Sequence, residues 1–371
     1  MESPLWSVKY RPSSWDEFLG QDVAVSSLRN LAGLQTCPNL ILLGPYGTGK
    51  SSAALVFARA LLGEVMDSNF LYLNVRDVTM YPITKAKRTI QDLAKLERSE
   101  RTPLDEYMST VYRAAKDSMK VRGEAGEPNR SQMLLQAITL FASTMTVAQD
   151  KVKLLVLDEA DALSIDMQQA LRRTMEVFSE VCRFVFITPS LSGWVPALIS
   201  RCVVLKFSSI EQSVIERQIQ SISEREGVRI DDLAVRAIAR ACDGDLRRAI
   251  NLLQVCSASG KTVTEDTVYE QSETPLQRGV REAVTLAVDG SYVESRNRVR
   301  RLVTIEGYSE REVLHEIGAE LMKRPFSPKV RSAFLDRVSE LDYRMVEARN
   351  QFIHLSAMLA SIWRMSRELS S

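Results

Sequence analysis

One glycine-rich segment limits what this chain can fold into more than any other, because it joins a strand to a helix through a turn that few sequences can form. Residues 44–51 read Gly-Pro-Tyr-Gly-Thr-Gly-Lys-Ser. The apolar residues 40–43 before it indicate a buried strand, and residues 52–62 after it are rich in helix formers. Strand, glycine-rich turn and helix in this order predict an α/β domain with a phosphate-binding loop, or P-loop.

In such a loop the backbone N–H groups surround a triphosphate at the positive end of the following helix, and glycines allow the backbone angles that this requires. Lys50 is expected to contact the β- and γ-phosphates. Ser51 offers a hydroxyl to Mg²⁺, which also needs a carboxylate from elsewhere in the chain. The residues predicted to surround the phosphates are Gly44, Pro45, Gly47, Thr48, Gly49, Lys50, Ser51 and Ser52.

A second apolar run supplies the missing carboxylate. Residues 154–157 are Leu-Leu-Val-Leu, and Asp158 and Glu159 follow directly. Asp158 at the strand end is the candidate for the metal side of the site, reaching Mg²⁺ through water. Glu159 lies one residue further on, where a carboxylate can orient or polarise an attacking water molecule without binding the metal.

Three further apolar runs, at 70–73, 184–187 and 203–205, bring the number of short predicted strands to five. Helical patterns separate them, the clearest at 162–178. Alternation of strands and helices is typical of a mostly parallel sheet that helices cover on both faces. The sequence therefore predicts a five-stranded parallel sheet with the nucleotide at the carboxyl ends of its strands.

Composition excludes several classes of protein. A chain of 371 residues is expected to form two or three domains, and the formal charge of +1 confines any nucleic-acid surface to a local patch. Five dispersed cysteines and two histidines make zinc sites and disulfides unexpected. The first residues lack a signal-segment pattern and no run has the length of a membrane span, so an intracellular protein is expected.

Further motifs follow one another in a fixed order: Trp-Ser-Val-Lys-Tyr-Arg-Pro at 6–12, Gly-Gln at 20–21, Asp-Glu-Ala-Asp at 158–161, Leu-Arg-Arg-Thr-Met-Glu at 171–176, Ser-Arg-Cys at 200–202 and Gly-Asp-Leu-Arg-Arg-Ala at 244–249. Together they resemble the small subunits of replication factor C. These are AAA+ ATPases that open a ring-shaped sliding clamp and close it around primed DNA. The resemblance runs nearly end to end, because residues 341–350 and the helical tail look like the collar of that family.

The resemblance implies an α/β P-loop AAA+ core with a parallel five-stranded sheet at 1–207, a helical lid at 208–272 and an all-helical oligomerisation collar at 273–371. It implies that Arg201 acts in trans, on the nucleotide of a neighbouring subunit, and that Arg247 reaches the γ-phosphate from the lid. Residues implied to line the adenine side are Tyr10, Arg11 and Pro12.

Basic residues after the second strand contact the DNA backbone in the family, and the nearest equivalents here are Lys85, Lys87 and Arg88. A solvated basic helix is the alternative for these three residues.

Three departures from the family pattern bear on hydrolysis and on structure. Pro189 stands where the family usually has an asparagine that senses the γ-phosphate, and proline offers neither a side-chain amide nor an N–H. Thr188 or Ser190 would have to replace it, so hydrolysis at this subunit's own site stays open. Residues 75–78 read Val-Arg-Asp-Val, where the family tends to have Ala-Ser-Asp-Glu. Residues 102–130 resemble an inserted segment that is largely helical or mobile, with its tip at 123–129.

The function that follows from the resemblance is an ATP- and Mg²⁺-dependent clamp-loader subunit of DNA replication. Its implied partners are a large subunit, other small subunits, the sliding clamp and primer-template DNA, in the cytoplasm of an archaeon or the nucleus of a eukaryote. Two alternatives stay open. One is a subunit of the same ring that binds nucleotide but does not hydrolyse it. The other is a different AAA+ DNA-processing motor, such as a branch-migration motor.

Overall fold

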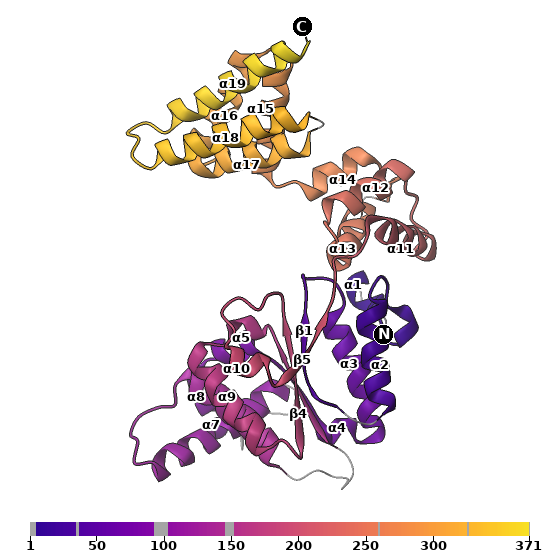
Figure 1. Cartoon of the computed structure of the whole chain (residues 1–371), viewed down its shortest axis with the longest axis vertical. Coiled ribbons are helices and arrows are strands. Elements are labelled where there is room, and N and C mark those ends of the chain that lie inside the picture. Colours follow the sequence, from indigo (N-terminus) through magenta and orange to yellow (C-terminus); the bar gives the residue numbers. More distant parts are fainter. Residues whose placement is uncertain are drawn as a thin grey trace. The chain divides into compact units, whose positions relative to one another are not determined.

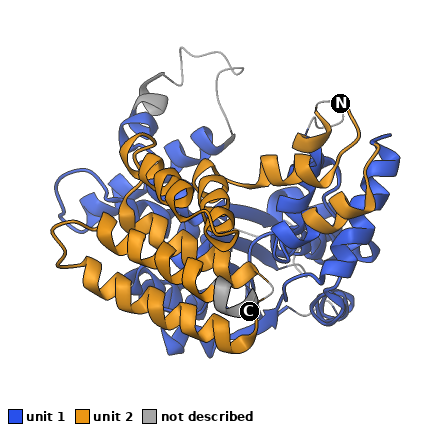
Figure 2. Cartoon of the chain, turned by 90° about the horizontal axis from the view of Figure 1, so that it is seen from above, with its two compact units in different colours: residues 1–228, 238–254 blue, residues 229–237, 255–371 orange. Residues whose placement is uncertain are grey.

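A computed structural model describes residues 5–34, 37–92, 103–144, 152–258, 260–324 and 326–370. The chain forms two compact units, which Figure 2 colours separately. The first unit comprises residues 1–228 and 238–254, and the second comprises residues 229–237 and 255–371. Among the described residues no helix combines the length and the apolar character that crossing a membrane would require.

A five-stranded sheet is the centre of the first unit, and its strand order is β2-β3-β4-β1-β5. Every neighbouring pair runs parallel. The strands are β1 (Asn39–Leu43), β2 (Phe70–Asn74), β3 (Lys153–Asp158), β4 (Cys182–Thr188) and β5 (Cys202–Lys206). The predicted parallel sheet is therefore confirmed, and each of the five apolar runs lies within one of its strands.

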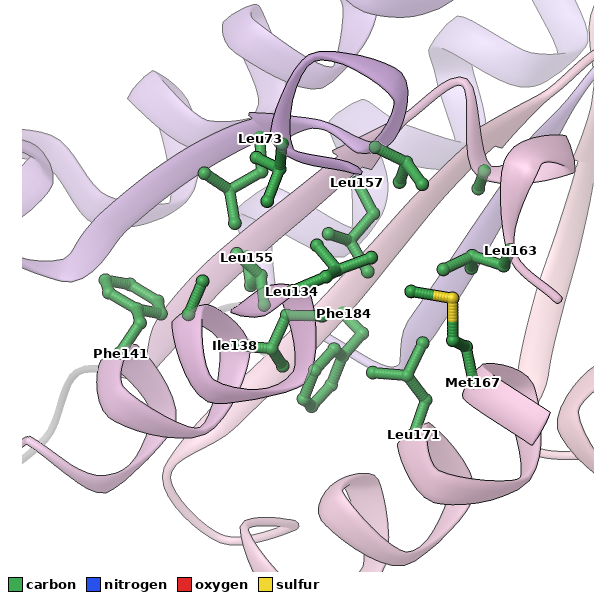
Figure 3. Close-up of a cluster of buried hydrophobic side chains, with 14 of the residues drawn as sticks. Leu73, Leu134, Ile138, Phe141, Leu155, Leu157, Leu163, Met167, Leu171 and Phe184 are labelled. Carbon is green, nitrogen blue, oxygen red and sulfur yellow. The ribbon is translucent and has the colours of Figure 1, made fainter. Parts of the chain in front are cut away.

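Successive side chains along a strand point to opposite faces of the sheet, so the buried side chains are divided between the two faces. On one face Leu40 and Leu42 pack with Phe57 of α3 (Lys50–Leu62), beside α2 (Asp22–Gly33). On the other face Leu155 and Leu157 meet α8 (Arg130–Ser143) and α9 (Ile165–Val177), as Figure 3 shows. Helices thus cover both faces of the sheet (Figure 1), and the carboxyl ends of the strands are left for the site.

The segment expected as an insertion is helical where it is described. Helix α7 (Pro103–Val121) leads to a short irregular tip and then to α8. Met108 and Val111 of α7 are fully buried in the same apolar cluster as the strand residues Leu155 and Leu157. Helices α7 and α8 therefore pack into the core of the first unit, whereas residues 121–127 of the tip are exposed. Residues 93–102 lie outside the described part of the chain.

The elements that follow β5 in the described residues are helices, joined by short loops and one isolated β-bridge. Those of the region expected to be a lid are α11 (Gln212–Arg225), α12 (Asp232–Ala241), α13 (Leu246–Ser257) and α14 (Glu265–Ser272). Those after it are α15 (Pro275–Val288), α16 (Tyr292–Thr304), α17 (Glu310–Lys323), α18 (Pro328–Met345) and α19 (Phe352–Ser370). Val284, Leu314 and Leu359 are among the residues buried between α15, α17 and α19. The predicted helical lid and all-helical C-terminal region are confirmed.

The remaining helices are short or lie near the sheet. They are α1 (Trp6–Lys9), α4 (Met66–Asn69), α5 (Val75–Met80), α6 (Ile83–Asp92) and α10 (Pro196–Ile199). Single-turn helices occur at Trp15–Glu17, Gly63–Val65 and Ala160–Ala162.

Candidate nucleotide-binding site

Two adjoining pockets lie where the strands of the first unit end. The first has a volume of about 250 Å³ and a mostly polar lining, which includes Lys50, Ser51 and Asp158. The second has a volume of about 260 Å³ and a more apolar lining, which includes Val8 and Ile250. Arg11, Gly47, Gly49, Ser52 and Arg247 line both pockets. A polar compartment that opens into an apolar one suits a nucleotide, with phosphates in the first and a base in the second.

The phosphate-binding loop has the backbone conformation that its glycines allow. Gly47 and Gly49 adopt positive φ angles of 70° and 94°, and helix α3 begins at Lys50. The Thr48 hydroxyl donates a hydrogen bond of 2.9 Å to the Pro45 carbonyl, which closes the turn. N–H groups at the start of a thirteen-residue helix have no partner within the helix, so the positive end of α3 faces the pocket.

Asp245, which precedes α13, lies directly against this loop. Its carboxylate accepts a hydrogen bond of 2.9 Å from the Arg248 N–H. A Cβ atom added to Gly47 would lie 1.7 Å from the Asp245 Oδ1 atom. The loop and the helix that carries Arg247 therefore touch, with no room for a side chain at Gly47.

Replacing Gly47 by alanine is expected to lower nucleotide affinity at least about tenfold. The new methyl group must displace Asp245, and the left-handed backbone conformation costs a residue with a side chain about 1–2 kcal/mol. Gly227→Ala is the matched control, since Gly227 has a φ of 67° and nothing within 4 Å of an added Cβ. It should lower the melting temperature without changing affinity. Fluorescence titration with a labelled ATP measures both variants. Equal affinity losses in both would show that contact with Asp245 is irrelevant.

Lys50 is buried in the polar pocket, with 7% of its surface exposed. Burial lowers the pKa of its ammonium group to about 8; the Asp158 carboxylate opposes this shift and the Arg247 guanidinium adds to it. The ammonium group donates a hydrogen bond to the Pro45 carbonyl of its own loop. A buried cation whose charge is incompletely balanced favours an anionic ligand.

Ser51 and Asp158 converge on the metal side of the pocket, as predicted. The Ser51 hydroxyl donates to Asp158 Oδ2 at 2.8 Å, and the Glu159 N–H donates to Asp158 Oδ1 at 2.8 Å. The Tyr72 hydroxyl of β2 also donates to Asp158 Oδ2. A hydroxyl oxygen and a carboxylate oxygen this close together are hard donors of the kind that Mg²⁺ prefers, so these residues fit the ion.

Glu159 lines the same pocket but its carboxylate has a cationic partner. Its φ of 52° is uncommon for a residue other than glycine. Glu159 Oε2 lies 3.1 Å from Arg76 Nε, and Arg76 Nη2 lies 2.9 Å from Asp161 Oδ2. Half of the Arg76 side chain is exposed and exposed ion pairs contribute little to stability, so the Glu159 carboxylate can leave Arg76 for a water molecule at little cost.

Pro189 and Thr188 line the polar pocket at the end of β4. The Thr188 hydroxyl, one of the possible replacements for an asparagine, donates a hydrogen bond of 2.8 Å to the Ser190 carbonyl. The Thr188 carbonyl accepts from the Gly44 N–H at 3.2 Å. The Ser190 hydroxyl accepts from the Ser192 N–H at 3.0 Å, so both possible replacements make hydrogen bonds within their own loop.

The expected adenine-side residues lie along the apolar pocket. Tyr10, Arg11 and Pro12 line it, and Arg11 Nε donates to the Ser52 hydroxyl at 3.0 Å. The Tyr10 hydroxyl donates to Glu226 Oε1 at 2.5 Å, which ties the N-terminal segment to the end of α11.

Arg201 lies outside both pockets, next to the short helix α10. Arg201 Nη2 and Nε donate to Glu176 Oε1 at 2.6 and 3.0 Å, and Nη1 donates to the Ala197 carbonyl at 2.7 Å. Glu176 also accepts from Arg172 Nε at 3.3 Å. A position away from the subunit's own nucleotide pocket is compatible with action on a neighbour's nucleotide.

The basic residues of α6 make ion pairs within the first unit. Lys85 Nζ lies 2.7 Å from Asp105 Oδ1, and Lys87 Nζ lies 3.2 Å from Glu127 Oε1. About half of each lysine side chain is exposed. The Arg88 side chain lies outside the described residues. Contact of these three residues with DNA stays a prediction.

Several unpredicted residues contact the predicted ones, among them Tyr72, Arg76, Glu176 and Asp245. Tyr72 carried a signal that could have identified it. It is the one polar side chain of its apolar run, and the strand that contains it pairs in register with β3, where Asn74 lies opposite Asp158. Arg76 lies in the segment 75–78, which departs from the family pattern.

The fold and this site define an AAA+ ATPase: a P-loop after β1, an Asp-Glu pair after β3 and an arginine-bearing helix beyond the sheet. Family models agree, with an AAA domain matching residues 33–195, an RFC1-like AAA+ ATPase lid domain matching 212–270 and the replication factor C C-terminal domain matching 275–361.

Known relatives specify the family. The chain is 31% identical to a replication factor C small subunit of Methanococcus maripaludis over 98% of this chain and 99% of that one. It is 29% identical to the Archaeoglobus fulgidus small subunit over 98% of both chains. This chain therefore belongs to the replication factor C small-subunit family. The solved Thermotoga maritima RuvB branch-migration motor aligns at a TM-score of 0.46 and 16% identity, covering 83% of this chain and 85% of that one.

Proposed function

We propose that this chain binds ATP with Mg²⁺ and uses it, as one subunit of a replication clamp loader, to load a sliding clamp onto primed DNA. Membership of the replication factor C small-subunit family gives the role as a clamp-loader subunit. The observation that carries the nucleotide proposal is the 2.8 Å approach of Ser51 Oγ to Asp158 Oδ2 beneath the P-loop, with the buried Lys50 beside it. These groups match the phosphate and metal contacts of P-loop ATPases.

The protein groups have distinct roles in this proposal. The loop N–H groups and Lys50 hold the phosphates, Arg11 and Arg247 line the passage between the pockets, and Tyr10 and Pro12 border the base. Ser51 and Asp158 would hold Mg²⁺, which would supply charge neutralisation on the phosphates. Catalysis then requires positioning and charge stabilisation without a covalent intermediate.

Each part of the chain has a separate proposed role. Residues 1–207 serve as the ATPase core, 208–272 as the lid and 273–371 as the collar that joins other small subunits and a large subunit. Lys85, Lys87 and Arg88 are proposed to contact the backbone of primer-template DNA. To do so, Lys85 must leave Asp105 and Lys87 must leave Glu127. Intracellular residence, in an archaeal cytoplasm or a eukaryotic nucleus, belongs to the same proposal.

A second candidate is a subunit of the same ring that binds ATP without hydrolysing it. One observation favours it: Pro189 supplies no side-chain donor to the pocket at the end of β4. Both candidates share the nucleotide site and differ only in whether its ATP is cleaved.

Replacing Glu159 by glutamine in the assembled clamp loader tests the proposal and separates the candidates. If this site hydrolyses ATP, its single-site turnover with clamp and primed DNA should fall about 100-fold or more, because the amide cannot accept a proton from water, while ATP affinity stays within about twofold. Glu180→Gln, an exposed change outside both pockets, is the control. Unchanged turnover would favour the non-hydrolysing subunit. Absence of both ATP binding and complex formation would refute clamp loading.

A further inference from the structure

Tyr72 places a phenol hydroxyl inside the polar pocket, on the carboxylate expected to serve the metal. The hydroxyl donates to Asp158 Oδ2, the same oxygen that accepts from the Ser51 hydroxyl at 2.8 Å. Tyr72 is also among the residues that line this pocket. The phenol therefore touches the metal side of the site without belonging to the P-loop or to the Asp-Glu pair.

The sheet fixes where this hydroxyl lies. β2 and β3 pair in register, with Tyr72 opposite Val156 and Asn74 opposite Asp158. The aromatic ring packs against the apolar cluster that contains Val156 and Phe57. Packing of the ring against this cluster and the hydrogen bond to Asp158 both orient the phenol, so its hydroxyl is a preorganised donor.

The hydrogen-bond donors around the Asp158 carboxylate leave one of its acceptor sites free. An ionised carboxylate has about four lone-pair sites. Three of them accept bonds here, from Tyr72, from Ser51 and from the Glu159 N–H. A tyrosine phenol has an ordinary pKa of about 10, so the Tyr72 hydroxyl stays protonated and donates throughout the neutral range. The fourth site is left for a metal-bound water.

We propose that Tyr72 is a positioning residue for Mg²⁺: its hydroxyl holds the Asp158 carboxylate in the orientation that receives the hydrated ion beside Ser51. This inference rests on the proposed function, because it assumes that the pocket binds Mg²⁺ with ATP. Donors that orient a metal-binding carboxylate typically change metal affinity about 10–100-fold when they are removed.

Tyr72→Phe tests the inference, since phenylalanine keeps the ring packing and removes only the hydroxyl. Affinity of the full chain for mant-ATP is measured by fluorescence in EDTA and across a MgCl₂ series. In EDTA the variant should match the wild type within about twofold. The Mg²⁺ concentration at half-maximal enhancement of binding should rise about tenfold. Tyr107→Phe is the control, because the Tyr107 hydroxyl donates to the Ala137 carbonyl at 2.7 Å away from the pocket.

The Asp158→Asn background shows whether Tyr72 acts through Asp158. There, adding Tyr72→Phe should cause no further rise in the Mg²⁺ requirement, because the carboxylate that Tyr72 orients is gone. A wild-type Mg²⁺ requirement in Tyr72→Phe, or a lower one, would overturn the inference while leaving ATP binding intact. A wild-type chain that binds mant-ATP in neither buffer would instead overturn the proposed function.

Discussion

Replacing Lys50 by methionine is expected to weaken ATP binding at least about 100-fold and to raise the melting temperature of the nucleotide-free protein. The first effect follows from loss of the cation that faces the phosphates. The second follows from burial, because the pKa of Lys50 is lowered from 10.5 to about 8. The charged ammonium group therefore destabilises the empty pocket, and methionine fills the same space without charge.

The sign of the pH dependence follows from that lowered pKa. Below pH 8 Lys50 is charged in the folded and unfolded states, and the folded state bears the cost of burying the charge. Between about pH 8 and 10.5 the folded state releases its proton first, so this cost disappears as pH rises. The stabilising effect of Lys50→Met, on the order of 1–2 kcal/mol at pH 7, should therefore shrink across this interval.

Differential scanning fluorimetry from pH 7 to 10 measures this difference between variant and wild type. Lys120→Met is the matched control, because Lys120 is an exposed lysine of α7 outside both pockets. It should change neither ATP affinity nor the pH dependence of melting. A Lys50→Met variant that is less stable than the wild type at pH 7 would contradict the account of Lys50 as a destabilising buried cation.

ATP binding should be linked to proton uptake for the same reason. Phosphate oxygens beside Lys50 stabilise its charged form, so binding near pH 9 restores a proton that the empty pocket has released. Calorimetry in two buffers of different ionisation enthalpy detects this uptake, and affinity for ATP should fall as pH rises above 8.

Local sequence signals were sufficient for the strands and the P-loop. Residues 40–43 and 154–157 are apolar runs of strand length, and all of them except the half-buried Leu43 are buried in the sheet. Helix boundaries were less accurate, because capping contacts decide them. The helix expected from residue 162 starts at Ile165, since the Ser164 hydroxyl accepts a hydrogen bond of 3.3 Å from the Met167 N–H.

Pairing between charged side chains was not predictable from the sequence. Arg76 and Glu159 are 83 positions apart, and they meet only because β2 and β3 are neighbours in register. Lys85 meets Asp105 for a similar reason, since α6 and α7 pack together. Motif resemblance assigns roles to single positions, whereas these pairs depend on strand register and helix packing. The ion pair between Arg76 and Glu159 therefore emerges only from the fold.

Arg201 provides the prediction with the largest expected effect on the assembled complex. In a reconstituted clamp loader, Arg201→Ala should lower hydrolysis at the neighbouring site about 1,000-fold, because an arginine that stabilises charge on the transferred phosphoryl group contributes about 10³–10⁵ in rate. ATP affinity of this chain's own pocket should stay within about twofold, since Arg201 lies outside both of its pockets.

The contacts of Arg201 allow this role. Its guanidinium is held by Glu176 at 2.6 Å, but 32% of the Arg201 side chain and 47% of the Glu176 side chain are exposed. An ion pair this exposed contributes little to stability, whereas a bidentate contact with a desolvated γ-phosphate is considerably stronger. We therefore predict that Arg201 exchanges Glu176 for the nucleotide of an adjacent subunit when the ring assembles.

Arg172→Ala is the control that isolates this function. Arg172 contacts the same carboxylate, at 3.3 Å from Glu176 Oε1, but lies outside the Ser-Arg-Cys segment. Its replacement should leave neighbouring-site hydrolysis within about twofold, because it removes an exposed ion pair only. Arg201→Lys should restore little of the lost rate, since an ammonium group lacks the planar fork that meets two phosphate oxygens. Single-turnover hydrolysis with clamp and primed DNA measures each variant, and loss of ATP binding in this chain's own pocket on Arg201→Ala would place the arginine in cis instead.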